Sequence, residues 1–224
     1  MKKFLISLFV VVTLFMVGCN KEENKKGIEF KESYEKLNGT TTKSGKEHRT
    51  VTINENNPFV ITTPEEVVKM LDNKETFYLY VGDPLCPWCR STVEKATEIA
   101  TNKKVDKVYA IEIWDDEGNE ILRDKYEMVD GKLTQTIKGT DAYNKMLASF
   151  NDLLRDYSIT DGDKEVPTGE KRIYAPNYFY IEHGVAKTLI TGKSDLQKDS
   201  REELTKEMLE DEEKQFNEFF SLKK

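Results

Sequence analysis

Two short apolar runs with a helical pattern between them constrain the fold of this chain more than any other feature. Phe77–Val81 is a continuous apolar segment, as expected for a strand that is buried on both faces. Val108–Trp114 is expected to be a second buried strand, and between the two Val93, Ala96 and Ile99 fall on one face of a helix. A strand, a helix and a strand in so compact a span predict a βαβ unit with parallel strands.

A pair of cysteines lies between the first strand and the helix, in the motif Cys86-Pro87-Trp88-Cys89. Pro87 fits a first helical turn because its missing N–H would have had no partner there. A thiol reacts as its thiolate, and a helix N-terminus lowers a cysteine pKa from about 8.5 into a range of roughly 3.5–7.5. The motif therefore predicts that Cys86 attacks a substrate disulfide and that the more buried Cys89 resolves the mixed disulfide. Trp88 is expected to be partly exposed and to stack on the substrate chain.

Two other roles of the cysteine pair have weaker support. A structural disulfide across a two-residue loop would constrain little chain entropy. A zinc site would need further ligands, and His48 and His183 are the only histidines. His48 lies near a polar segment, and His183 lies in an expected hairpin turn. We therefore expect neither a metal nor an organic cofactor, and electrons would pass through the two sulfurs.

The remaining pattern predicts further helices and two hairpins. Thr63-Pro64-Glu65-Glu66 predicts a helix start, with Thr63 as the N-cap residue, Pro64 in the first turn and Glu66 completing a capping box. Hairpins are expected around Asp130-Gly131 and His183-Gly184.

The end of the chain adds two helices to this pattern. A helix is expected from Thr140 or Asp141 to about Tyr157, followed by a polar loop over residues 158–171. Ser200 and Glu203 form a second capping box, which predicts a last helix. The order is thus β-α-β, an insertion with one helix, and β-β-α.

The N-terminus has the pattern of an export signal. Two lysines precede the apolar run Phe4–Val17, which is shorter than the roughly 20 residues of a spanning helix. The run closes on Gly18 and Cys19 before a strongly polar segment, and here the sequence resembles a bacterial lipoprotein signal. That resemblance implies removal of residues 1–18 and a lipid anchor on Cys19. The alternative is an ordinary cleaved signal in which Cys19 is incidental. Met16, where such signals usually carry Leu, departs from the pattern.

Composition agrees with an exported domain on a polar tether. The net charge of −7 argues against a nucleic-acid partner, which needs clustered Lys and Arg in excess. Three cysteines are too few for a disulfide-stapled scaffold. Residues 19–50 are interpreted as a lipid-anchored polar tether, in which Phe30, Tyr34 and Leu37 predict a short amphipathic helix that docks. Residues 51–224 would form the folded domain.

The order of elements, with a Cys-x-x-Cys at the start of the first core helix, resembles the thioredoxin superfamily over Thr76–Trp114 and Lys171–Phe220. The resemblance implies a thioredoxin-like three-layer α/β/α sandwich with a mixed central sheet and an insertion, residues 116–172, between its βαβ and ββα halves. It also implies a cis-proline beside the cysteines, which Ala175-Pro176 matches, with Ala175 pairing with the substrate backbone. The alternative is a trans proline at a strand edge.

More closely, the chain resembles extracytoplasmic thioredoxin-like lipoproteins labelled transport or bacteriocin-transport accessory proteins. The resemblance is carried by Phe30…Tyr34-Glu35…Leu37-Asn38-Gly39, Asn57-Pro58-Phe59, Cys86-Pro87-Trp88-Cys89-Arg90, Asp130-Gly131-Lys132 and Arg172…Ala175-Pro176. It implies a thiol–disulfide oxidoreductase anchored at the extracytoplasmic face of a bacterial membrane. Its partners would be exported protein thiols and disulfides, with a membrane redox protein or a transporter as further candidates. The alternative is a non-catalytic adaptor of a transporter.

The chain departs from the superfamily pattern at the site. Tyr80 stands six residues before the first cysteine, where thioredoxins carry a buried Asp that assists deprotonation of the resolving thiol. Glu112 is a candidate replacement, although a surface-facing glutamate is the simpler interpretation. Asp83 and Glu94 would disfavour a thiolate at Cys86, whereas Arg90 and the helix end would favour it. Pro87-Trp88 also replaces the usual Gly-Pro, so the direction, oxidase or reductase, stays open.

Overall fold

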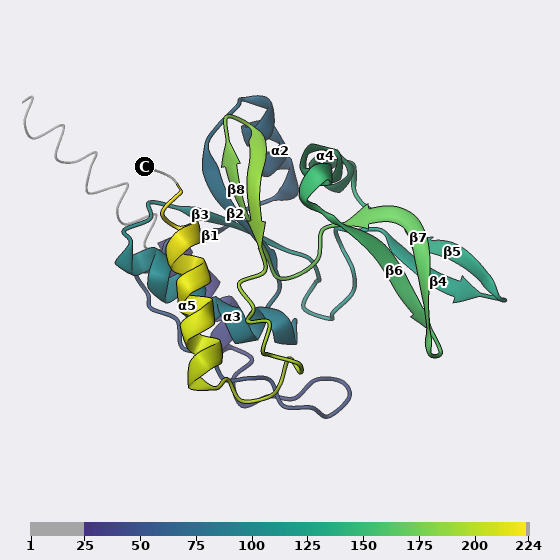
Figure 1. Ribbon diagram of the computed structural model, residues 1–224, viewed down its shortest axis with the longest axis horizontal. Coiled ribbons are helices and arrows are strands. Elements are labelled where there is room, and N and C mark those ends of the chain that lie inside the picture. Colours follow the sequence, from purple (N-terminus) through teal and green to yellow (C-terminus); the bar gives the residue numbers. More distant parts are fainter. Residues whose placement is uncertain (1–24, 223–224) are drawn as a thin grey trace, which may run out of the picture.

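The computed structural model describes residues 25–222 (Figure 1). Its largest sheet has five strands in the order β1-β3-β2-β8-β9. Their bounds are β1 Phe59–Ile61, β2 Phe77–Gly82, β3 Val108–Glu112, β8 Asn177–Glu182 and β9 Val185–Ile190. The strands β1, β3 and β2 are parallel, and β8 and β9 are antiparallel to their neighbours. The predicted parallel βαβ unit and the mixed central sheet are therefore confirmed.

Helices cover both faces of this sheet, because the central strand β2 is apolar on both sides. Tyr78 and Tyr80 belong to a core with α3 (Pro87–Asn102) and α5 (Lys206–Phe219), which pack against each other. Leu79 and Val81 belong to a second core with α2 (Pro64–Asp72) and α4 (Asp141–Phe150). The predicted start of α2 is confirmed, since the Thr63 side chain accepts the N–H of Glu66 at 3.2 Å.

The N-terminal segment packs on the first of these cores. A helix covers residues 25–35, as the apolar spacing predicts, and its Phe30 and Tyr34 are buried against β2. The Asn38 side chain then donates to the carbonyl of Val51 and accepts its N–H, at 2.8 and 3.1 Å. Residues 25–53 are thus held on the body of the molecule by packing and by hydrogen bonds.

The predictions for residues 1–18 and for Cys19 lie outside the described residues. Among the helices of residues 25–222, none is both long enough and apolar enough to cross a membrane.

The insertion contains two hairpins rather than one. The predicted hairpin at Asp130-Gly131 is confirmed as β4 (Lys125–Val129) and β5 (Lys132–Ile137). A second pair, β6 (Arg155–Asp161) and β7 (Lys164–Arg172), occupies the region predicted as a helix end and a polar loop. Figure 1 shows both hairpins extending from the α/β body on the side away from α5.

Two sequence predictions in this region are therefore wrong. The helix expected to reach Tyr157 ends at Phe150, a short 3-10 turn follows over Asn151–Leu153, and the polar loop over 158–171 is a strand pair. The physical reason is exposure, because a two-stranded ribbon that meets water on both faces needs no apolar alternation. The loop between the strands is Gly162-Asp163, a two-residue hairpin signal that the sequence-based prediction missed, and Gly162 has a positive φ of 61°.

The capping box predicted at Ser200 and Glu203 is also wrong. Helix α5 begins at Lys206, and its N-cap is Thr205, whose side chain accepts the N–H of Met208 at 3.3 Å. Residues 198–202 form a turn instead, in which the Glu202 carboxylate accepts the backbone N–H of Asp199 at 2.8 Å. The helix buries Met208, Phe216 and Phe219, and its C-cap residue Phe220 is also buried.

Candidate active site

The two cysteines open helix α3. Cys86 is its N-cap residue, Pro87 occupies the first turn, and the Cys86 sulfur accepts the N–H of Cys89 at 3.4 Å. Both are free thiols, so the structure describes the reduced pair, and they are 4% and 0% exposed. The sequence prediction that Cys89 is the more deeply buried of the two is confirmed.

The surroundings shift the pKa values of the two sulfurs in opposite directions. The pKa of Cys86 is lowered, first by a hydrogen bond from the Cys89 thiol and then by the backbone N–H groups of Cys89 and Trp88. Burial and the charge of Asp83 act in the opposite direction and raise it. The pKa of Cys89 is raised well above its ordinary value, first by burial and then by Cys86. The pair thus contains one sulfur that favours the thiolate and one that holds its proton.

Ala175-Pro176 lies directly beside the pair. The peptide bond between them is cis, as the resemblance implied, and β8 begins at the next residue. The Ala175 carbonyl accepts a hydrogen bond from the Cys86 thiol at 3.7 Å. Trp88 is half-buried, in agreement with the expected partial exposure, and the Lys193 ammonium lies 4.8 Å from its ring centroid.

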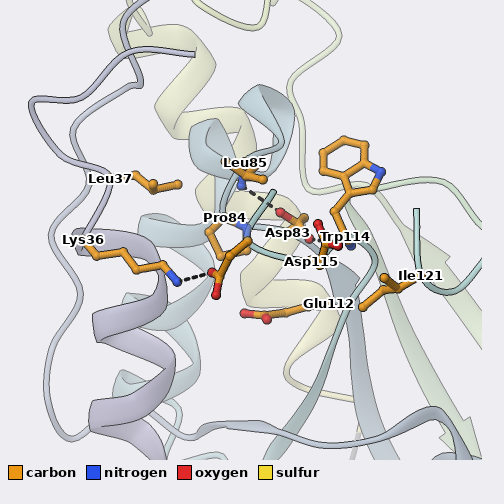
Figure 2. Close-up of a pocket in the computed structure, with 10 residues that line it drawn as sticks. Lys36, Leu37, Asp83, Pro84, Leu85, Glu112, Trp114, Asp115 and Ile121 are labelled. Carbon is orange, nitrogen blue, oxygen red and sulfur yellow. Dashed lines mark hydrogen bonds and ion pairs between the residues drawn. The ribbon is translucent and has the colours of Figure 1, made fainter. Parts of the chain in front are cut away.

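Asp83 fixes the loop that leads into the cysteines. One oxygen of its buried carboxylate accepts the N–H of Leu85 at 2.8 Å, and the other accepts that of Trp114 at 2.9 Å (Figure 2). This second oxygen also accepts the N–H of Ile113 at 3.2 Å. Burial raises the pKa of this carboxyl to about 6, against these three hydrogen bonds. Strand β3 ends at Glu112, earlier than predicted, because the next two N–H groups bond to Asp83. The Asp-Pro pair after a strand is the turn signal that could have shown this role.

Glu112, the candidate replacement for a buried Asp, is the last residue of β3. It lines a pocket beside the Asp83 loop, together with Trp114 and Ile121 (Figure 2). Burial raises its pKa, and a hydrogen bond with Ser33 of the N-terminal helix and the charge of Lys36 lower it. Its interactions are therefore with the N-terminal helix, at the end of β3.

Tyr80 lies in the same buried core as the two cysteines. Its side chain is 1% exposed, and its hydroxyl lies 2.6 Å from that of Tyr34. The sequence showed that the carboxylate was missing, but gave no sign that the hydroxyl at this position would meet that of Tyr34 on the N-terminal helix.

Arg90, directly after the pair, anchors the N-terminal segment to α3. The guanidinium is 1% exposed and donates to the carbonyls of Arg49 at 2.7 Å, Tyr34 at 2.9 Å and Pro84 at 3.3 Å, and to the Asn38 amide oxygen at 2.8 Å. Its predicted role beside the Cys86 thiolate is thus replaced by a structural one. Glu94 also turns to this segment, where it accepts the N–H of Thr52 at 2.9 Å.

A buried ion cluster ties the insertion to the strand before the cis-proline. The Glu120 carboxylate receives the guanidinium of Arg123 at 2.6 Å and that of Arg172 at 3.4 Å. Arg123 also donates to the carbonyl of Ile173, two residues before Ala175. The position of Ala175-Pro176 is therefore supported from the side of the hairpins.

The histidines are far apart in the chain and differ in burial. His48 is 6% exposed, and His183 lies in the β8–β9 turn with a positive φ of 51°. Over residues 25–222, no group of three or more His, Cys, Asp or Glu residues is arranged to hold a metal ion.

No protein-family model matches this chain, and no curated protein matches it. The chemistry of the site therefore has to be derived from its own residues.

Proposed function

We propose that this protein is a thiol–disulfide oxidoreductase whose active site is Cys86-Pro87-Trp88-Cys89. The observation that carries the proposal is the asymmetry of the two sulfurs at one helix N-terminus, where Cys86 has a lowered pKa and Cys89 a raised one. A nucleophilic thiol and a protonated second thiol are the two parts that disulfide exchange through a mixed disulfide requires.

The thioredoxin-like fold is part of the same proposal. It is supported by the strand order β1-β3-β2-β8-β9, with three parallel strands followed by two antiparallel ones. The placement of the cysteines after β2 and of a cis-proline before β8 further supports it. The two hairpins and α4 would then be an insertion between the βαβ and ββα halves.

The reaction has two steps. In the first, the Cys86 thiolate attacks a substrate disulfide, one substrate sulfur leaves with a proton as a thiol, and the other becomes bonded to Cys86. In the second, Cys89 loses its proton and attacks the Cys86 sulfur, and the substrate leaves as its second thiol. The substrate is then reduced and the pair is oxidised, and the reverse sequence oxidises a substrate dithiol.

The substrate class proposed is exported protein, met at the extracytoplasmic face of a bacterial membrane. This part of the proposal rests on the signal pattern and on the expected lipid anchor at Cys19. The same motif gives no reason to expect a metal or an organic cofactor, because the two sulfurs carry the electrons.

The test of the proposed function is a trapping experiment with Cys89→Ser. The variant keeps the Cys86 nucleophile but cannot complete the second step, so mixed disulfides with exported proteins should accumulate in the cell envelope. They would be detected as complexes that dissociate when a reductant is added. Serine is close in size to cysteine, which limits disturbance of this fully buried position.

The matched control is the double variant Cys86→Ser/Cys89→Ser, which should trap nothing. If Cys89→Ser forms no reductant-sensitive complex in cells that contain the folded protein, the enzymatic proposal is wrong. The alternative, a non-catalytic adaptor of a transporter, would then be favoured.

A further inference from the structure

A lysine ammonium lies beside the cysteine pair, over the ring of Trp88. Trp88 is located between Cys86 and Cys89 in the first turn of α3, and its side chain is half-buried. The Lys193 ammonium lies 4.8 Å from the centroid of the indole ring. Cations are attracted to the face of an indole ring by its quadrupole, so this contact is favourable. It places a positive charge at the helix end that carries the reacting sulfur of Cys86.

The backbone that carries Lys193 is fixed on α5. The Lys193 carbonyl accepts a hydrogen bond from the Gln215 side chain at 3.2 Å. Gly192 has a positive φ of 70° and lies so close to Phe216 that a Cβ atom there would come within 2.1 Å of the ring. On the other side of Lys193, Ser194 is 0% exposed. The side chain of Lys193 therefore starts from a defined position, which limits the space that its ammonium can reach.

The charge of Lys193 is free to interact with a substrate. Within residues 25–222 its ammonium has no carboxylate at ion-pair distance, not even that of Asp195 on the same loop. Lys36, which lines the pocket beside Leu85, differs in this respect because it is paired with Asp116 at 2.7 Å. A half-buried cation without an acidic partner attracts an anionic group of a ligand that docks next to it.

We propose that Lys193 is a specificity-determining residue, through which the protein prefers substrate disulfides that carry a carboxylate beside the reacting sulfur. The inference rests on the proposed function and deepens it, because it names a substrate class. These substrates are exported proteins in which Asp or Glu lies next to the cysteine that Cys86 attacks. A carboxylate at that position repels the approaching thiolate, and the nearby ammonium offsets the repulsion.

The same contact alters the role expected of Trp88. The sequence predicts that this ring stacks on the substrate chain, as a bare indole would do with apolar or aromatic groups. In the structure an ammonium lies over the ring, so the surface beside the cysteines presents a positive charge. Trp88 then acts as the support that keeps Lys193 at the site.

The test compares two small aromatic disulfides that differ in charge. Dithiobis(nitrobenzoate) carries a carboxylate on each ring, and dithiodipyridine is neutral near neutral pH. Each releases a coloured thiol when the Cys86 thiolate attacks one of its sulfurs and its disulfide bond breaks. The measured quantity is the ratio of the two second-order rate constants for the purified, reduced protein. An effect of Lys193 on the reactivity of the Cys86 sulfur itself acts on both reagents and cancels in this ratio.

In Lys193→Gln we expect the ratio of the anionic to the neutral reagent to fall about threefold at low ionic strength, because one attractive charge is lost. Salt at about 0.5 M shortens the screening length and should bring the variant to within about 1.5-fold of the wild type. Lys193→Arg keeps a cation that also binds to indole rings, so it should keep the ratio of the wild type at either salt concentration.

The matched control is Lys187→Gln, which removes the same charge from an exposed position of β9. Ile190 pairs with Tyr178 at the end of the sheet near the cysteines, and Lys187 lies toward the opposite end of the strand. Its ratio should stay within about 1.5-fold of the wild type. The proposal is overturned if Lys193→Gln leaves the ratio unchanged, or if Lys187→Gln lowers it equally.

The reagents need no protein partner, so this result is independent of whether Cys89→Ser traps exported proteins in cells. An unchanged ratio in Lys193→Gln contradicts the role of Lys193 and leaves the proposed function standing. Absence of trapped complexes contradicts the proposed function, whatever the ratio. Failure of the inference and failure of the proposed function are thus separate outcomes.

Discussion

Replacing Arg90 with alanine should lower the free energy of unfolding by about 4 kcal/mol. The guanidinium is 1% exposed and makes four hydrogen bonds, three of them to backbone carbonyls and one to the Asn38 amide oxygen. Alanine removes the donors of Arg90 from all four acceptors, and a buried acceptor without a partner costs about 1–3 kcal/mol. The Asn38 oxygen keeps the N–H of Val51, and the Tyr34 carbonyl keeps that of Leu37. The loss falls short of the full sum because water reaches the opened space.

The measurement is a urea unfolding curve, with two comparison variants. Arg90→Lys keeps the charge and the aliphatic stem but has no planar fork, so it should recover only part of the stability. Lys69→Ala, at an exposed position of α2, should change the free energy of unfolding by less than about 0.5 kcal/mol. A loss below about 1 kcal/mol in Arg90→Ala would contradict the structural role assigned to this side chain.

Glu212→Gln should remove a fall in stability between about pH 5 and pH 8. Glu212 on α5 is 0% exposed, and neither of its carboxylate oxygens has a hydrogen-bond partner among the described residues. Burial raises the pKa of Glu212 to about 8, and the charge of Asp211 adds to this rise. The charges of Arg49 and Lys95 lower the pKa and oppose it. In the unfolded chain the pKa of a glutamate is about 4.3.

The sign follows from the protons bound in each state. Between the two pKa values the folded protein holds a proton on Glu212 that the unfolded chain has released, so the free energy of unfolding falls as the pH rises. One pKa unit corresponds to about 1.4 kcal/mol, so the fall from pH 5 to pH 8 should be about 3 kcal/mol. Glutamine carries no titrating proton and should be the more stable residue at pH 8.

Urea unfolding at several pH values checks this prediction. The control Glu218→Gln replaces an exposed glutamate on the same helix and should keep the slope of the wild type. A wild-type stability that is flat across this range, or a slope that Glu212→Gln retains, would show that Glu212 is ionised in the folded protein.

The core of the fold could be predicted because its residues show both the burial pattern and the local geometry of the element that they form. Phe77–Val81 and residues 108–111 are apolar on both faces, as expected for strands that are covered on both sides. Thr63 and Cys86 begin helices that Pro64 and Pro87 also mark. Agreement between burial and local geometry is what made these segments predictable.

The parts that could not be predicted lack either a clear burial pattern or an unambiguous local signal. Strands β6 and β7 face water and have no apolar alternation, so the segment had the composition of a loop. Thr205 and Ser200 both have the side chain of an N-cap residue, and local sequence does not show which one α5 uses.

At the site, the contacts made across the fold were the ones missed. The four acceptors of Arg90 come from residues 34, 38, 49 and 84, and the Tyr34 hydroxyl reaches Tyr80 on β2 from the N-terminal helix. Such partners are set by tertiary packing, whereas the spacing of Cys86 and Cys89 is local and was visible from the start.

Equilibrium titration of the Cys86–Cys89 pair against glutathione tests the central claim most directly. The account predicts one two-electron transition between the dithiol and an intramolecular disulfide, with a midpoint between roughly −270 and −120 mV. A midpoint near the lower value indicates a reductase, and one near the upper value indicates an oxidase. A pair that stays reduced at every glutathione ratio, or that takes up glutathione without closing the Cys86–Cys89 bond, would contradict the account.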